Sequence, residues 1–153
     1  MDEFAESEPP GSTNWLLYNC WNALSRDGGL PLVSDVITSN SNIVPIDCQA
    51  SVIEVNDPNP WNFVFQYHWH TPYPNLGSEL SHTRVRDYPC MMHAKALMSE
   101  YFLAREHRTP VYHEIEQVLF GISRQYRRLI LPMVGAKDDV TGLLVGVRSV
   151  RPP

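Results

Sequence analysis

Residues 110–150 read PVYHEIEQVLFGISRQYRRLILPMVGAKDDVTGLLVGVRSV, and this stretch decides the fold. Its first part, Val111–Val118, is rich in β-branched and aromatic residues, while Gln125–Val134 and Val140–Val150 carry apolar residues at every second position. Strict alternation predicts antiparallel strands that are buried on one face and solvated on the other. Because the intervening segment Gly135–Asp139 is short and turn-rich, the last two strands should form a hairpin.

The chain before this stretch supplies the other elements of the domain. Cys90–Glu106 is composed of good helix formers without a breaker, so it predicts a long helix. Ala50–Val55 and Trp61–Trp69 predict two strands that pair as a hairpin, and Ser12 or Thr13 can cap a helix over Trp15–Leu24. We therefore expect an α+β domain: a five-stranded antiparallel sheet with helices on one face and an N-terminal helix.

Length and composition indicate one globular domain. The chain has 153 residues, of which 43% are hydrophobic and 19% charged, enough to bury a core without covalent staples. We expect this domain to span residues 12–150, after a disordered acidic lead-in at residues 1–11. The net charge of −5 argues against a nucleic-acid partner and against an anionic membrane.

Cysteine usage and hydropathy indicate a reducing, cytoplasmic location. The three cysteines, Cys20, Cys48 and Cys90, are widely spaced and form no CxxC pair, so neither a disulfide framework nor a thiolate zinc site is expected. No apolar run approaches the roughly 20 residues that a membrane-spanning helix needs. The acidic start of the chain is the opposite of a secretion signal.

Several local strings resemble a known family. They are Trp21 followed by Gly28-Gly29-Leu30-Pro31 and Asp35, the string Arg108-Thr109-Pro110-Val111, and the strand Tyr126-Arg127-Arg128-Leu129-Ile130-Leu131-Pro132-Met133. Together with the order of the elements, they resemble a PAS domain, and more closely a branch of stand-alone bacterial PAS proteins. The likeness runs from Trp15 to Val150. The glycine-containing stretch that this branch carries after its second strand is replaced here by Tyr67–Thr71.

The resemblance implies a sensory or regulatory module in signal transduction, with a signalling protein as its partner and no catalysis. A small apolar ligand would bind between the long helix and the concave face of the sheet. The candidate pocket residues are Phe63, Phe65, Leu97, Met98, Tyr101, Leu129, Leu131, Leu143 and Val145.

The first helix carries an apolar stripe of Trp15, Tyr18, Trp21 and Leu24. This stripe is too apolar for a helix that stands alone on a surface. Either the helix docks across its own sheet, or it pairs with a second copy of the chain. The resemblance favours a homodimer, because PAS domains commonly dimerise through an N-terminal helix, and aromatic anchors suit such a contact.

Metal and cofactor chemistry is only weakly indicated. His68 and His70 lie two apart on a predicted strand and could share one metal, but a pair of solvated polar residues is the more usual outcome. His93 lies where haem-binding PAS sensors carry a proximal ligand, yet the helical stripe predicts a surface or rim position for it. Flavin is not expected, because Cys90 lacks the Asn-Cys-Arg-Phe context of flavin photosensors.

The sequence lacks the usual motifs of an enzyme active site. It contains no GxSxG elbow, no glycine-rich phosphate loop and no HExxH string. Asp87 and His113 are the remaining acid/base candidates. Three classes stay open: a ligand-binding sensor, which we favour, a protein–protein adaptor without a ligand, and an enzyme.

Overall fold

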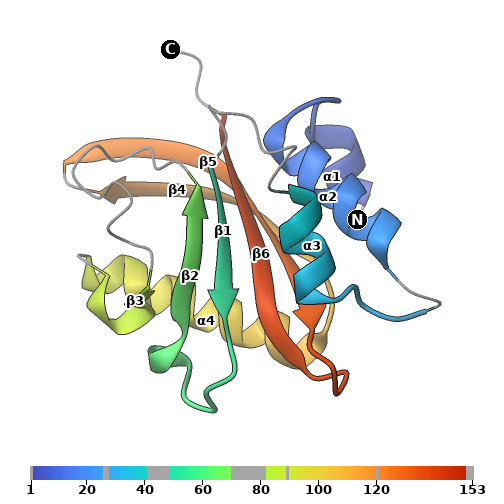
Figure 1. The fold of residues 1–153 in the computed structure, drawn as a ribbon. Coiled ribbons are helices and arrows are strands. Elements are labelled where there is room, and N and C mark those ends of the chain that lie inside the picture. Colours follow the sequence, from blue (N-terminus) through green and yellow to red (C-terminus); the bar gives the residue numbers. More distant parts are fainter. Residues whose placement is uncertain are drawn as a thin grey trace.

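The computed structural model of the protein describes residues 2–25, 28–40, 49–69, 82–88, 90–119 and 121–150. Its elements are α1 (Asp2–Ser7), α2 (Thr13–Leu24), α3 (Val33–Asn40), β1 (Gln49–Glu54), η1 (Pro60–Asn62), β2 (Val64–Trp69), β3 (Thr83–Arg84), η3 (Val85–Asp87), α4 (Met91–His107), β4 (Val111–Leu119), β5 (Ile122–Val134) and β6 (Val140–Ser149). The strands form one sheet in the order β3-β2-β1-β6-β5-β4, and every neighbouring pair is antiparallel (Figure 1).

The α+β architecture and the five expected strands are confirmed. The structure adds a sixth, two-residue strand, β3, which pairs with Val64 and Phe65 at the start of β2. A two-residue strand carries too little sequence pattern to be recognised from alternation. The predicted hairpin of the last two strands is also present as the β5–β6 pair.

Both faces of the sheet are covered, which differs from the expectation of one wet face. Helix α4 lies behind the sheet in Figure 1, and α1, α2 and α3 cover the opposite face beside β6. Neighbouring residues of β5 such as Ile130 and Leu131 are therefore both buried, although they point to opposite faces. We call the face under α4 the inner face, and the face under α1–α3 the outer face.

Helix α2 docks on the outer face of its own sheet. Ser12 caps it by accepting a hydrogen bond from the Trp15 amide at 3.2 Å, as the sequence predicts. Leu17 is fully buried, and the Trp21 indole donates to the Pro132 carbonyl at 2.8 Å. Of the two arrangements left open for this helix, docking across its own sheet is the one observed, so the Trp21 ring is not available to a second copy.

The strings that carry the family resemblance meet in space. Trp21 bonds to Pro132, and the Val134 amide donates to the Pro31 carbonyl at 3.0 Å. Leu32 forms an isolated parallel bridge with the same Val134. These contacts hold the segment after α2 against β5, and α3 follows this segment. Gly28 lies in the turn that precedes this segment and has a positive φ of 69°, a conformation that glycine adopts readily.

The acidic lead-in differs from the disorder expected for residues 1–11. Residues 2–7 form α1, and Phe4 is buried on the outer face with its ring centroid 4.8 Å from that of Tyr18. One aromatic anchor inside an acidic stretch is enough to pack a short helix, although composition alone favours a solvated tail. That residues 12–150 form one domain remains a prediction.

Helix α4 is the long helix expected at Cys90–Glu106. It ends at Arg108, whose φ of 56° places it in the left-handed region. Near this end, the Arg105 guanidinium donates to the carbonyls of Val55 and Asp57 at 3.1 and 2.7 Å. These bonds fix the helix to the β1–η1 loop. None of the helices in the described ranges has the length and apolar character needed to cross a membrane.

Candidate functional site

The contact between α4 and the inner face of the sheet brings together most of the predicted pocket residues. Phe63, Phe65, Leu97, Tyr101, Leu143 and Val145 belong to one buried cluster, and Met98 packs against it partly exposed. Strands β1, β2, β5 and β6 form its floor and α4 its roof. We call this set the inner cluster, and it is the candidate ligand site.

Leu129 and Leu131 do not belong to the inner cluster, which corrects the prediction. They lie on the outer face under α1–α3, in a cluster with Leu17 and Trp21. Period two shows that alternate residues share a face, but the pairing register decides which face. In the structure Ile130 stands opposite Val145 and therefore takes the inner position that the sequence assigned to Leu129 and Leu131.

The inner face also carries a buried ion pair. Arg128 is only 3% exposed, is paired with Glu100 of α4, and donates to the Tyr126 hydroxyl at 2.9 Å. Burial opposes its charge, but Glu100 and the two nearby tyrosines outweigh burial and raise the pKa of Arg128. For the neighbouring Tyr101 hydroxyl, burial itself raises the pKa, because the neutral form is favoured away from water. The site therefore combines an apolar wall with a cation and a neutral hydroxyl.

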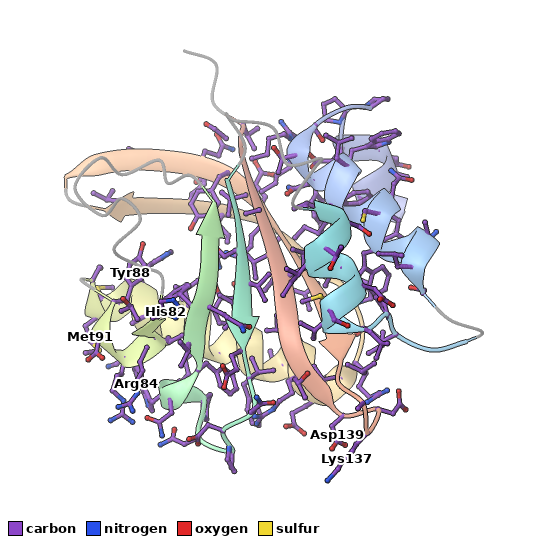
Figure 2. The ribbon with its side chains drawn as sticks, in the orientation of Figure 1. His82, Arg84, Tyr88, Met91, Lys137 and Asp139 are labelled. Carbon is purple, nitrogen blue, oxygen red and sulfur yellow. The ribbon has the colours of Figure 1, made fainter. Side chains whose placement is uncertain are left out.

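His93 faces inward, against the expectation of a surface or rim position. It is 9% exposed, and its ring centroid lies 4.9 Å from that of Tyr88, which in turn packs on Phe65. Figure 2 labels Tyr88, His82 and Met91 at the corner of the molecule where α4 begins.

The other candidate sites either lie outside the described residues or are not brought together within them. The side chain of His68 and all of His70 lie outside the described residues, so the pair stays a prediction. Within the described ranges, no group of three or more His, Cys, Asp or Glu side chains is placed to hold a metal ion. Asp87 follows the edge strand β3, whereas His113 lies on β4 at the opposite edge, so the structure does not bring these two together.

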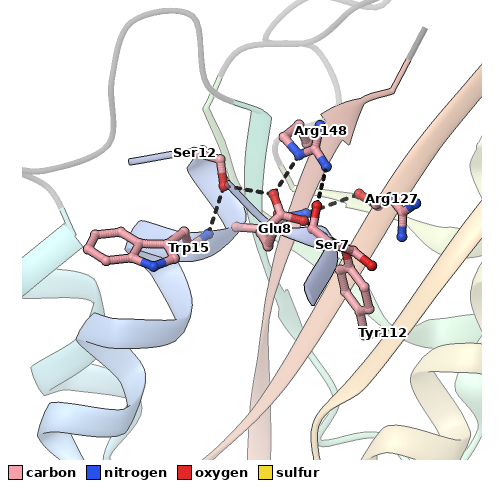
Figure 3. Close-up of polar contacts among 8 residues, drawn as sticks. Ser7, Glu8, Ser12, Trp15, Tyr112, Arg127 and Arg148 are labelled. Atoms are coloured by element: carbon pink, nitrogen blue, oxygen red, sulfur yellow. Dashed lines mark hydrogen bonds and ion pairs between the residues drawn. The ribbon is translucent and has the colours of Figure 1, made fainter. Parts of the chain in front are cut away.

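A polar site that sequence reasoning missed lies on the outer face, around the carboxylate of Glu8 (Figure 3). This side chain is fully buried and pairs with the Arg148 guanidinium, Nε to Oε1, at 2.6 Å. Ser12 and Tyr112 each donate a hydroxyl hydrogen bond to it at 2.7 Å. Arg127 lies beside this set, 5.9 Å from the Tyr112 ring centroid.

We call Glu8 with Ser12, Tyr112 and Arg148 the Glu8 lock. It binds the segment after α1 to β4 and β6, far away in the sequence. Burial and the hydrogen bond to Glu8 raise the pKa of Tyr112 to about 12. The sequence does contain a signal for this site. Arg127 and Arg148 lie on two predicted strands that pair with each other, and two buried arginines need an acidic partner.

Comparisons with known proteins bear on the fold. No family profile matches the sequence, and no curated protein matches it either. Solved structures do match. One is the VqmA–ligand–DNA complex of Vibrio cholerae, with a TM-score of 0.56 and 12% identity, covering 74% of this chain and 50% of the other. The fold is PAS-like.

Two further matches carry this assignment. A light–oxygen–voltage domain studied with a flavin analogue matches with a TM-score of 0.52 and 13% identity, over 77% of this chain and 85% of the other. The PAS domain of Bordetella pertussis BvgS matches with a TM-score of 0.50 and 10% identity, over 78% and 88%. Identities this low show the PAS-like fold and leave the ligand and the partner of this chain to be argued.

The comparisons correct one prediction. Net charge led us to expect no nucleic-acid partner, but a protein with this fold is found in a complex with DNA. The charge of one domain therefore does not exclude nucleic acid. The chain spans about half the length of VqmA, so the activity of the whole VqmA protein is not carried over to it.

Proposed function

We propose that this PAS-like chain is a cytoplasmic sensory module that binds a small, mainly apolar ligand between α4 and the inner face of the sheet. The observation that carries the proposal is the inner cluster itself, an apolar wall with Tyr101 and the Arg128–Glu100 pair in the same layer. A ligand with an apolar body and one hydrogen-bonding end fits such a site. The VqmA match, solved with a ligand, supports this choice.

The proposed module signals by association with a protein and performs no chemistry on its ligand. The acid/base candidates Asp87 and His113 are exposed and lie near opposite edges of the sheet, which supports a binding role. The location in a reducing compartment is supported by Cys20 and Cys90, which are free thiols.

Native mass spectrometry tests the ligand, on the purified protein as isolated and after incubation with a panel of small apolar compounds. The decisive variant is Ala94→Leu, because Ala94 is fully buried on α4 and faces the inner cluster. Its matched control is Ala50→Leu, the same exchange at a position 2% exposed on the outer face. Both exchanges overpack a core, so both lower stability to a similar degree.

We expect the wild-type chain and Ala50→Leu to carry the added ligand mass, and Ala94→Leu to lose it. Equal retention of the ligand by both variants would contradict the inner site. The proposal also fails when the folded wild-type chain takes up no compound. An absorption band near the Soret wavelength in the purified protein would instead point to haem at His93.

A further inference from the structure

Strand β4 forms a long edge of the sheet (Figure 1). Its nine residues pair with β5 on one side, and within the described residues no strand lies along the other side. The opposite edge of the sheet is β3, which has only two residues and offers little backbone for pairing. About half of the peptide groups of β4, over a length of about 30 Å, therefore point outward and can pair with a further strand.

The end of β4 has the least support from its own chain. Gln117–Leu119 pair with Ile122–Arg124, beyond the point where Val150 bonds to Gln125 at the end of β6. Among the described residues the sheet has only two strands here, and Val118 is 70% exposed. A two-stranded ribbon is marginally stable in water, whereas a third strand adds hydrogen bonds and apolar contacts. An added strand would therefore stabilise this part of the sheet.

A groove lies at the start of β4. It has a volume of about 390 Å³ and opens between the C-terminal turns of α4 and the first residues of the strand. Leu103, Pro110 and Val111 give it apolar walls, and Leu103 is 48% exposed. Val111 packs against the inner cluster, so the groove lies on the inner side of the sheet. Because side chains alternate between faces, a strand added to β4 would place one inner-facing side chain at this groove.

The outer side of β4 is acidic. Tyr112 packs against the cluster under α1–α3, so Glu114 and Glu116 lie on the same side of the strand, and both are exposed. Glu114 is held from β5, by Arg127 at 3.4 Å and by the Gln125 amide at 2.6 Å. Glu116 stands opposite the same uncharged Gln125. Opposite charges across a strand pair are favourable, so this edge favours a neighbour with a basic residue opposite Glu116.

The same acidic residues oppose a second copy of the chain at this edge. Full antiparallel overlap of two β4 strands sets residue 111 of one copy opposite residue 119 of the other, and therefore Glu114 opposite Glu116. Like charges directly opposite each other destabilise a strand pair. The occupant that the edge favours is thus a different chain.

We propose that an extended segment of a partner protein adds to β4 as a further strand, antiparallel like every other neighbouring pair of the sheet. The segment carries a basic residue opposite Glu116 and, five residues later, a large apolar residue that enters the groove beside Leu103. The odd spacing puts these two side chains on opposite faces of the segment, as the acidic outer side and the inner groove require. The proposal rests on the proposed function and names the surface of its association step.

Main-chain hydrogen bonds give such an added strand its affinity, and the side chains give it selectivity. A designed peptide, added to the full chain, tests both. It is capped at its two ends, alternates threonine and valine, and carries lysines opposite Glu114 and Glu116 and a leucine opposite Val111. Amide hydrogen exchange followed by NMR should show slower exchange at alternate residues of β4.

Two N-methylated forms of the peptide are matched probes of strand pairing. Methyl groups on the nitrogens that face β4 should abolish binding, because they remove the donors and block the approach of the two backbones. Methyl groups on the intervening nitrogens, which face away from β4, should leave it intact. Equal binding of the two forms, or no binding of the unmethylated peptide to the folded chain at millimolar concentration, would overturn the proposal.

Substitutions in the chain test the selectivity. Glu116→Lys should weaken binding about threefold or more, and a peptide with glutamates in place of its lysines should bind this variant better than the wild-type chain. Asp139→Lys is the matched control, because it makes the same change of charge in the exposed β5–β6 loop. Leu103→Asn should also weaken binding, whereas Met92→Asn, at another exposed apolar residue of α4, should not. Unchanged affinity in both Glu116→Lys and Leu103→Asn would refute this class of partner.

The edge and the ligand site can fail separately. The mass of a bound small compound is measured without the peptide, and the protection of β4 is measured without the compound. A wild-type dimer that protects the same β4 amides without peptide would show that a second copy occupies the edge, and would overturn the proposal.

Discussion

Replacing Glu8 by alanine tests whether the acidic lead-in is part of the folded structure. The Glu8 carboxylate is fully buried and has three partners: Ser12 before α2, Tyr112 on β4 and Arg148 on β6. Alanine removes the carboxylate and leaves two hydroxyls and a guanidinium without their acceptor. A solvated lead-in would make the same exchange nearly neutral.

The expected loss of stability follows from this burial. Breaking a buried ion pair by removing one partner costs about 3–5 kcal/mol. Because the Arg148 side chain is 23% exposed, water can take over part of its solvation, and the lower end of that range applies. We expect Glu8→Ala to lower the free energy of unfolding by about 3 kcal/mol.

Urea unfolding followed by tryptophan fluorescence and by circular dichroism measures this change. Glu6→Ala is the matched control, because Glu6 is an exposed glutamate two residues earlier, at the end of α1. A double-mutant cycle with Arg148→Ala isolates the pair, and we expect a coupling energy above about 1 kcal/mol. If the free energies of unfolding of Glu8→Ala and Glu6→Ala lie within about 0.5 kcal/mol of each other, the Glu8 lock is not part of the stable fold.

Three further outcomes are expected. Trp21→Phe should cost about 1–3 kcal/mol in urea unfolding, because it removes the donor to the buried Pro132 carbonyl, and an unchanged midpoint would contradict this. Gly146→Ala should cost about 1–3 kcal/mol in the same assay, since its new methyl group collides with Asn14 on α2; a more stable variant would refute that close approach. The pKa of Tyr112 is raised to about 12, compared with about 10 in the unfolded chain. The contribution of this group to the free energy of unfolding is therefore complete below about pH 10 and is lost as the pH rises toward 12. Tyr112→Phe should reduce this alkaline loss of stability, and an equal pH dependence in the two proteins would argue against it.

The regular elements could be predicted because their signals are local. The cap at Ser12, the breaker-free run of α4 and the alternation of β5 each need only a few neighbouring residues to be recognised. The sequence predicted the two hairpins but not the order of the strands in the sheet, which the structure supplies. Local signals of this kind gave the five main strands, and they also placed Phe63 and Leu97 at the α4–sheet contact.

Leu129 and Leu131 were assigned to the wrong face because alternation shows which residues share a face but not which face that is. A strand that is covered on both sides shows apolar residues at both odd and even positions, as Leu129, Ile130 and Leu131 do. Only the pairing with β6 decides which of them points toward α4. His93 was misplaced for a related reason. Large apolar residues of α4 such as Met92 and Leu103 are exposed, so the apolar residues of this helix do not by themselves identify its buried face.

The two clusters are not independent, because consecutive residues of β5 belong to different faces of the sheet. Arg128 reaches inward to Glu100 of α4, while the carbonyl of the preceding Arg127 accepts a hydrogen bond from Asn14 of α2 at 3.2 Å. Successive residues of a strand point to opposite faces, so Ile130 packs in the inner cluster while Leu129 and Leu131 pack under the N-terminal helices. The inner site and the N-terminal helices therefore share β5 as their common wall, and the packing of each constrains the other through the same strand.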